Sequence, residues 1–163
     1  MEKPEMTEAV IRLEPELAFL TRALDAIYRR RGYPLERAHY LLLHHLRGTP
    51  KSSRDLAEEL SLDHSTIARQ IGAMLRQGLV SKTGNPADER SRLIEPTVRG
   101  RHLYESTRDI RLERIASLLD GWEESDRRLL ADLTVRFNHA LRETLDEFEP
   151  GTPISLENSI KRK

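Results

Sequence analysis

The sequence predicts a mainly α-helical chain with a small β-hairpin wing, arranged as a winged helix-turn-helix between N- and C-terminal dimerisation helices. Apolar residues recur every three or four positions through most of the 163 residues, which is the period of a helix. Two short helical segments joined by a tight turn occupy the middle of the chain. Two β-capable runs on either side of a turn that contains Gly and Pro follow directly.

The apolar spacing from Val10 predicts a first helix that ends before Gly32, in which Pro15 marks either a kink or a start near Glu14, because proline fits the first turn of a helix. Its apolar residues fall on one stripe: Val10, Leu13, Leu17, Leu20, Leu24 and Ile27. Such a stripe needs a partner surface to exclude water. Because most soluble oligomers are two-fold dimers, we expect this helix to pair with the C-terminal helices and with a second copy of the chain.

The second and third predicted helices are short. The second runs from about Leu35 to Leu46 and stops at Gly48. Its inward face is expected to hold Leu35, His39, Leu42 and Leu46. The third begins after Ser52, because Ser52 with Asp55 three residues later is close to a capping box.

A fourth helix and a hairpin complete the predicted winged domain. Asp63 caps the helix, which ends at Gly78. Residues 79–83 and 92–95 are the expected strands, and residues 84–91 form a charged tip.

Two further helices are predicted after the hairpin. Thr97 caps a helix to about Asp120, and Gly121 separates it from the last helix. The last helix carries an apolar stripe: Leu130, Leu133, Phe137, Leu141, Leu145 and Phe148. Dimer contacts are expected at Leu13, Leu17, Leu20, Leu133, Phe137 and Leu141. The predicted divisions are an N-terminal dimerisation helix at 1–34, a winged domain at 35–100, C-terminal dimerisation helices at 101–149 and a flexible tail at 150–163.

The composition excludes several classes of function. The chain has no cysteine, which removes disulfides, thiolate metal sites, a catalytic cysteine and a thiol redox switch. It carries no Walker loop, H-E-x-x-H or G-x-S-x-G motif, so we expect neither an enzyme nor a cofactor. No apolar run approaches the roughly 18 residues that span a membrane, and the N-terminus lacks a signal-peptide pattern, so the expected compartment is the cytoplasm.

Three histidines share the second predicted helix: His39, His44 and His45. With Glu36 they offer ligands for a metal ion. Their spacing matches no diagnostic metal motif, and packed or solvated histidines are the simpler interpretation, so we predict no metal site.

Charge is unevenly distributed along the chain, although its 27 basic and 27 acidic residues cancel. Between His64 and His102 there are seven Lys or Arg and three Asp or Glu, and seven minus three leaves plus four. Phosphate binding depends on local charge rather than on the total. The centre of the chain is therefore a candidate for binding nucleic acid.

The fourth predicted helix has a polar face opposite its apolar stripe, and this face carries Ser65, Thr66, Arg69 and Gln70. The small hydroxyl groups allow close approach to phosphates at the positive end of the helix. Arg69 and Gln70 are long enough to reach base edges in a major groove. The alternative is an ordinary solvated face, but the helix-turn-helix spacing favours DNA contact.

The hairpin tip carries a second candidate site. Asp88 stands two residues before Arg90, so we expect a carboxylate–guanidinium pair that aims Arg90 into a minor groove. Arg92 is a candidate for a phosphate. The alternative is a solvated turn rich in charge.

In their order and spacing, these segments resemble the MarR family of bacterial transcription regulators. The similarity covers residues 55–60, 65–71, 78–80 and 88–94, followed by Thr97 and Gly100. The resemblance implies a homodimer with interlocked terminal helices, and DNA contacts at Ser65, Thr66, Arg69, Gln70 and Arg90, with Asp88 as the partner that orients Arg90. Pro96 departs from the leucine common in the family, and because proline lacks a donor the second strand should end there.

The resemblance also implies that a small aromatic or anionic effector binds between the dimerisation helices and the winged domain and weakens DNA binding. In this chain the lining residues would be Tyr28, Arg29, Tyr33, His39 and Tyr40. We therefore predict a homodimeric, sequence-specific regulator, preferably a repressor, that binds a pseudo-palindromic operator. The alternative is a winged-helix adaptor that binds an acidic protein and not DNA.

Overall fold

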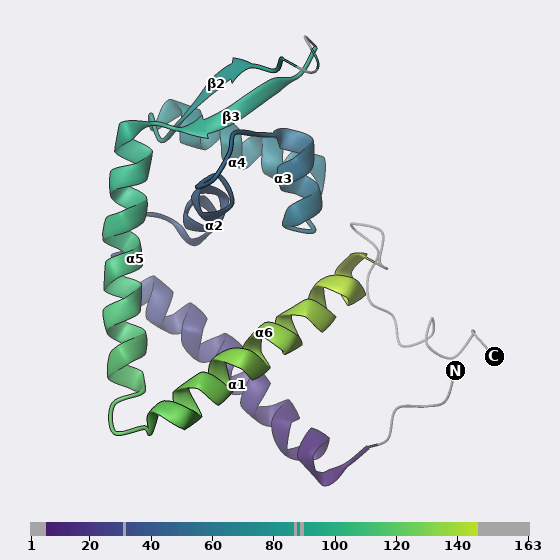
Figure 1. Cartoon of the computed structure of the whole chain (residues 1–163), viewed down its shortest axis with the longest axis vertical. Helices are drawn as coiled ribbons and strands as arrows, with labels where there is room; N and C mark the ends of the chain where they lie inside the picture. Colours follow the sequence, from purple (N-terminus) through teal and green to yellow (C-terminus); the bar gives the residue numbers. More distant parts are fainter. Residues whose placement is uncertain (1–5, 31, 87, 89, 147–163) are drawn as a thin grey trace, which may run out of the picture.

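The computed structural model of the chain describes residues 6–30, 32–86, 88 and 90–146. In chain order the elements are α1 (Glu8–Arg30), α2 (Arg37–His45), β1 (Lys51–Ser52), α3 (Ser53–Glu59), α4 (His64–Arg76), β2 (Val80–Gly84), β3 (Arg92–Pro96), α5 (Val98–Leu118) and α6 (Glu124–Asp146). Helices α2 to α4 gather with the strands at one end, and α5 leads from there to α6 at the other (Figure 1). The predicted mainly α-helical winged helix-turn-helix is confirmed.

The buried core of the described residues lies within the winged part of the molecule. It draws side chains from α2, α3, α4, the hairpin and α5, and its fully buried members include Leu42, Leu56, Ile67, Met74 and Ile94. The predicted inward face of the second helix is confirmed, and its members are all buried: Leu35, His39, Leu42 and Leu46. Because packed interiors resist deformation, this core holds α4 and the hairpin in one fixed arrangement.

Local capping interactions begin three of the helices as predicted. Ser52 and Asp55 form a reciprocal capping box. The backbone N–H of Ser52 donates to the Asp55 carboxylate at 3.0 Å, and the backbone N–H of Asp55 donates to the Ser52 hydroxyl at 3.2 Å. Asp63 accepts from the N–H of Thr66 at 2.8 Å, and Thr97 accepts from the N–H of Gly100 at 3.0 Å. These bonds satisfy backbone donors that the first helical turn leaves unpaired.

Of the two interpretations of Pro15, a helix start near Glu14 is wrong, because α1 begins at Glu8 and contains Pro15. Thr7 supplies the start: its side-chain oxygen accepts the N–H of Val10 at 3.4 Å. A proline inside a helix removes the bond to the carbonyl four residues earlier, here that of Ile11. The turn before Pro15 remains helical despite that loss.

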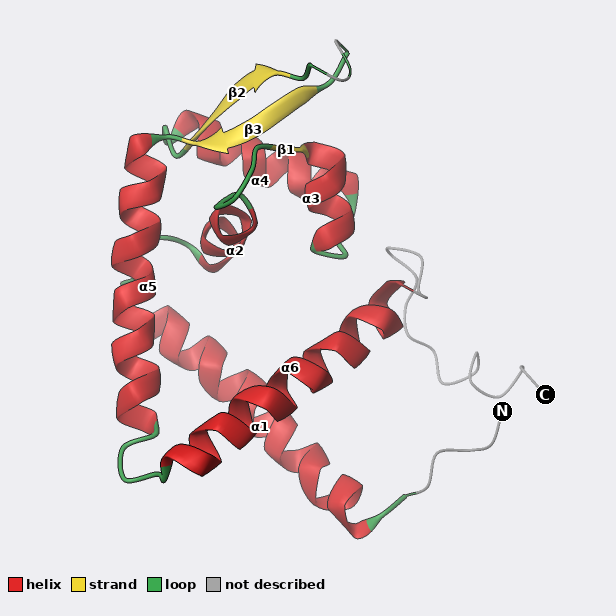
Figure 2. Cartoon of the chain, viewed as in Figure 1, coloured by secondary structure: helices red, strands yellow, loops and turns green. Residues whose placement is uncertain are grey.

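The sheet has three antiparallel strands in the order β1-β3-β2, whereas the sequence predicted only the hairpin of β2 and β3 (Figure 2). The additional strand pairs with β3 through Lys51↔Ile94 and Ser52↔Leu93. Two residues are too few to show the alternation that identifies a strand in a sequence. The second strand of the hairpin ends at Pro96, as predicted.

Helices α1 and α6 leave their apolar faces uncovered in the single chain. On α1 the exposed side chains include Leu13, Leu20 and Leu24, and on α6 they include Leu133, Phe137 and Leu141. Phe148 and the predicted tail at 150–163 lie outside the described residues. None of the described helices combines the length and apolar character that a membrane crossing requires.

Candidate nucleic-acid interface

The turn between α3 and α4 determines which face of α4 points outward. Ser61 has a left-handed φ of 49°, and the N–H of Leu62 bonds to the carbonyl of Ala57 at 3.0 Å. This is the Schellman termination, here with Ser61 where glycine is usual. Asp63 caps the next helix, so α4 begins at His64 and buries Ile67, Ile71 and Met74 against the core.

The polar residues predicted for DNA contact lie together on the other face of α4. Ser65 and Arg69 are exposed, and Thr66 and Gln70 are half-buried. Ser65 and Arg69 are four residues apart, so they are neighbours on one side of the helix. The arrangement offers hydroxyl, guanidinium and amide groups along one helix surface, which suits recognition of base edges.

At the beginning of α4, one carboxylate binds both predicted hydroxyl groups. Ser65 donates its hydroxyl to Asp63 at 2.5 Å, and Thr66 donates its hydroxyl to the other carboxylate oxygen at 2.7 Å. Hydrogen bonds from Ser65 and Thr66 hold the pKa of the Asp63 carboxyl well below its ordinary value. From the sequence, Asp63 was expected only to cap the helix. The hydroxyl residues at the second and third positions after the cap are the signal from which this second role could have been predicted.

The hairpin tip is held by short-range hydrogen bonds rather than by the predicted ion pair. Asp88 accepts the backbone N–H of Arg90 at 2.9 Å, and no ion pair joins the two side chains. A carboxylate readily bonds a backbone amide two residues ahead, which makes a compact turn. Asn85 donates its side-chain amide to the Ser91 hydroxyl at 2.6 Å and links the two sides of the tip. Asp88 therefore shapes the turn, and the exposed Arg90 side chain extends from it.

Basic side chains of the strands continue the surface formed by the tip. Lys82 pairs with Ile94, and Gly84 pairs with Arg92. Since residues two apart in a strand and directly paired residues share a face, Lys82 and Arg92 lie on one side of the hairpin. Both are exposed. Lys82 is one of the seven central basic residues, but it was not among the residues predicted for the site.

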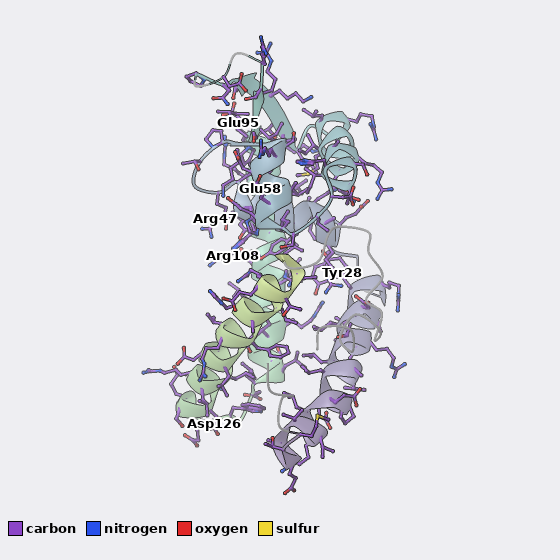
Figure 3. All side chains as sticks on the ribbon, turned by 90° about the vertical axis from the view of Figure 1, so that its right-hand side faces the viewer. Tyr28, Arg47, Glu58, Glu95, Arg108 and Asp126 are labelled. Atoms are coloured by element: carbon purple, nitrogen blue, oxygen red, sulfur yellow. The ribbon has the colours of Figure 1, made fainter. Side chains whose placement is uncertain are left out.

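The predicted effector residues come together only in part. Tyr28 and Tyr33 stack with ring centroids 4.5 Å apart and line a cavity of about 100 Å³. Figure 3 shows Tyr28 at the end of α1 nearest the winged domain. Arg29 is exposed and does not line this cavity, whereas His39 is buried in the core with its Nε2 atom unpartnered in the described structure. Their predicted positions in the cleft are therefore wrong.

Arginines from α2 and α5 complete this cleft. Arg37, Arg111 and Arg114 line the same cavity. The guanidinium of Arg114 lies 4.8 Å from the centre of the Tyr33 ring, and that of Arg111 lies 4.7 Å from the centre of the Tyr40 ring. Burial raises the pKa of Tyr28, whose hydroxyl donates to the carbonyl of Leu35 at 3.0 Å. The cleft thus combines aromatic surface with positive charge.

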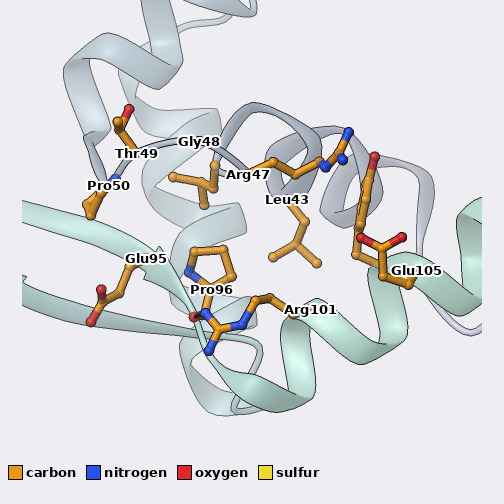
Figure 4. Close-up of a pocket in the computed structure, with 11 residues that line it drawn as sticks. Leu43, Arg47, Gly48, Thr49, Pro50, Glu95, Pro96, Arg101 and Glu105 are labelled. Atoms are coloured by element: carbon orange, nitrogen blue, oxygen red, sulfur yellow. Dashed lines mark hydrogen bonds between the residues drawn. The ribbon is translucent and has the colours of Figure 1, made fainter.

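A larger pocket of about 340 Å³ lies on the winged domain between the end of α2, β3 and the start of α5 (Figure 4). Arg47, Arg101, Glu95 and Glu105 contribute charges of both signs, and Tyr104 lines it as well. Arg101 already donates to the carbonyl of Pro96 at 2.6 Å. The balanced charges select no ligand by its sign, and none of the predicted site residues lines this pocket.

Two of the three histidines of the second predicted helix have partners other than a metal ion. His44 Nδ1 lies 2.9 Å from the hydroxyl of Tyr104, and His45 Nδ1 lies 2.9 Å from a carboxylate oxygen of Glu59. Within the part of the chain that the structure describes, no three His, Asp or Glu side chains are placed to hold a metal ion together.

A helix-turn-helix with an outward polar helix, followed by a basic hairpin, defines the class of winged helix-turn-helix DNA-binding proteins. Residues 33–91 match the model of the MarR family. A relative from Bacillus subtilis (strain 168), the uncharacterized HTH-type transcriptional regulator YxaD, is 36% identical over 132 residues, covering 78% of this chain and 92% of that protein. The chain therefore belongs to the MarR family of transcriptional regulators.

Solved structures of other proteins share this fold. A transcriptional regulator SlyA superposes with a TM-score of 0.69 at 24% identity, covering 84% of this chain and 99% of that one. A mutant of MarR from E. coli, solved in complex with operator DNA, gives a TM-score of 0.65 at 18% identity, covering 82% of this chain and 99% of that one. At these identities the two structures support the fold.

Proposed function

We propose that the chain binds a pseudo-palindromic DNA operator as a homodimer and represses transcription there. The observation that carries the proposal is the joint exposure of the polar face of α4 and the basic hairpin. Arg69 lies on α4, and Arg90 and Arg92 lie on the hairpin. Their guanidinium groups are cations for the major groove, the minor groove and the phosphates of the DNA. Because phosphate contacts release counterions, binding is expected to weaken steeply as salt rises.

The homodimer is supported by the uncovered apolar faces of the terminal helices. Leu133 and Phe137 on α6 keep 47% and 40% of their surface exposed, and Leu13 on α1 keeps 47%. Contiguous apolar surface of this kind marks an interaction site in a chain that stays in solution. A second copy offers the same faces, so a two-fold dimer covers both sets at once.

Dimer symmetry determines the form of the operator. Two recognition helices spaced by one turn of DNA, roughly 34 Å, read equivalent half-sites in a sequence of about 16 to 20 base pairs. A bound dimer of that span excludes other proteins from the same DNA, which favours repression over activation. Because the operator lies on the chromosome, we expect the protein in the cytoplasm.

A small aromatic anion is the proposed effector. The stacked Tyr28 and Tyr33 rings offer flat apolar surface, and Arg37, Arg111 and Arg114 offer guanidinium groups for a carboxylate. The cleft joins α1 to α5, so a ligand there can alter the angle between the dimer-forming helices and the winged domain.

Selection from a random duplex pool, followed by gel-shift titration, tests the proposal. The wild-type protein should enrich a two-fold symmetric sequence and bind it far more tightly than random duplex. Arg69→Ala should lose this preference, whereas Arg128→Ala, an exposed arginine on α6 paired with Glu124, should keep it. Binding to random duplex no better than that of a neutral control protein, with no enriched sequence, would favour the adaptor interpretation instead.

A further inference from the structure

We infer that Asp63 determines what the beginning of α4 recognises, because it restricts the Ser65 and Thr66 hydroxyls to accepting hydrogen bonds from DNA. This end of the helix then selects an exocyclic amino group of adenine or cytosine in the major groove rather than a phosphate. The inference rests on the proposed DNA-binding function and concerns the chemistry of its specificity.

The hydrogen-bond geometry assigns each proton. A hydroxyl group has one proton to donate and two lone pairs to accept with. Ser65 and Thr66 lie 2.5 and 2.7 Å from separate oxygens of Asp63, and the backbone N–H of Thr66 donates to the same carboxylate at 2.8 Å. An ionised carboxylate only accepts, so both hydroxyl protons point toward Asp63. Only the lone pairs of the two hydroxyl oxygens are left to bind a group of the DNA.

Those lone pairs match some DNA groups and not others. Phosphate oxygens only accept, so a hydroxyl can bind phosphate only by leaving Asp63, and the carboxylate charge repels phosphate as well. In the major groove, adenine N6 and cytosine N4 donate, whereas guanine O6 and N7 and thymine O4 accept. Ser65 is the exposed hydroxyl of the pair, so it is the one that reaches an amino group.

The next turn of α4 has the opposite polarity. Arg69 follows Ser65 by four residues on the same helix side, and its guanidinium only donates. Guanine, with two acceptors on its major-groove edge, is the base that best fits such a donor. We therefore expect each half-site to combine an amino-bearing base opposite Ser65 with a nearby guanine opposite Arg69.

The test uses the full chain and the operator selected from a random duplex pool. In the selected half-site, each adenine is replaced by purine and each cytosine by 2-pyrimidinone, which removes the amino group alone. One replacement should weaken wild-type binding about fivefold, the effect of one hydrogen bond. Ser65→Ala, which lacks the acceptor, should bind the normal and the modified duplex with equal affinity.

Asp63→Ser tests the role of the carboxylate itself. Serine is also a favoured helix cap, so α4 should remain folded by circular dichroism. A single neutral hydroxyl cannot fix both neighbouring hydroxyls, so the fivefold discrimination should fall below about twofold while binding to random duplex rises several-fold. Glu58→Gln removes one charge from the adjacent α3, where Glu58 pairs with Arg54, and it should keep the full discrimination.

The outcomes separate the two proposals. Sequence-specific binding by the wild-type protein with no sensitivity to amino-group removal overturns this inference and leaves the proposed function standing. The inference is also overturned if Asp63→Ser still discriminates between the normal and the modified duplex. If Asp63→Ser does not fold, the same result in Ser65→Ala overturns it. Failure of the wild-type protein to bind any duplex overturns the proposed function, and this inference with it.

Discussion

A β-carbon built on Gly100 would lie only 2.0 Å from the backbone carbonyl oxygen of Leu79. The same region holds two bonds from Thr97, whose N–H donates to that carbonyl at 3.0 Å and whose hydroxyl donates to the carbonyl of Gly78 at 2.7 Å. The first turn of α5 is therefore docked directly on the backbone between α4 and β2. The close approach is the physical reason for a glycine at position 100. The hydrogen bond donated by the hydroxyl group is the reason for a threonine at position 97.

Gly100→Ala is expected to destabilise the protein by about 3 kcal/mol, because a methyl group cannot share space with a backbone carbonyl. Urea unfolding followed by circular dichroism measures the change. Gly72→Ala is the matched control: this glycine lies inside α4, and the nearest atom to its added β-carbon is a side-chain nitrogen of Arg76 at 3.6 Å. Alanine should be neutral or stabilising there by up to about 1 kcal/mol. Equal effects of the two substitutions would contradict the docking argument.

Interactions between residues close in sequence were the most predictable part of this molecule. Ser52 and Asp55 are three residues apart, so their capping box depends on little beyond local geometry. The same holds for the cap at Thr97. At Asp88 two local donors compete, and the sequence alone does not decide between the backbone amide and the guanidinium of Arg90; in the structure the backbone amide donates to the Asp88 carboxylate.

Features that depend on tertiary packing were not predictable in this way. Strand β1 exists only through its pairing with β3, which is separated from it in the chain by α3, α4 and β2. Arg111 and Arg114 were missing from the predicted effector cleft, since they reach Tyr40 and Tyr33 from α5, far along the chain. His39 was assigned to the cleft through the family resemblance, although the apolar spacing of its helix also placed it on the inward face, where it is buried.

Arg90→Ala should weaken binding to the selected operator by about 1 to 3 kcal/mol while leaving the fold intact. The side chain is exposed at the hairpin tip, so it contributes cationic contact to DNA and little to packing. Gel-shift titration at several salt concentrations measures both the affinity and its salt slope. Arg128→Ala, which removes the same charge from α6, serves as the control. Unchanged operator affinity in Arg90→Ala would remove this residue from the interface.

The double variant Leu133→Glu with Phe137→Glu should be monomeric in sedimentation at micromolar concentration. The two residues lie four apart on one side of α6, and four carboxylates would meet across a two-fold interface without partners. Val135→Glu is the control, since residue 135 lies on the opposite side of the helix and is already 68% exposed. A dimer in the double variant would show that α6 does not form the interface.

Benzoate, a small aromatic carboxylate, should bind the cleft and release the operator. Arg114→Ala should reduce its affinity about tenfold in calorimetry, because a guanidinium over the Tyr33 ring is positioned for the carboxylate. Arg29→Ala should have no effect, since Arg29 is exposed and lies outside the cavity lining. Similar losses in both variants, or binding that leaves operator affinity unchanged, would argue against an effector site in this cleft.

Stability should fall between about pH 7.5 and about pH 5.5 in a manner that depends on His44. Burial, together with the nearby His45 and Arg47, lowers the pKa of His44 below its ordinary value of 6.5. Because the folded state binds this proton less readily than the unfolded state, neutral His44 contributes stability above pH 6.5, and that contribution is lost as the pH falls below this value. The titrating ring is in direct contact with α5, because the Nδ1 atom of His44 lies 2.9 Å from the Tyr104 hydroxyl.

Carboxylates do not account for a change in that pH range. The pKa of Glu59 is lowered from 4.5, chiefly by the hydrogen bond from Lys51, and that of Asp55 is lowered from 3.8 by its bonds to Ser52. Their contributions are present above those ordinary values and are lost only in more acidic solution. Thermal unfolding at both pH values should therefore give a smaller decrease for His44→Gln than for the wild type. His102→Gln, which removes an exposed histidine of α5, should keep the wild-type decrease; a full decrease in His44→Gln would assign the pH dependence to another group.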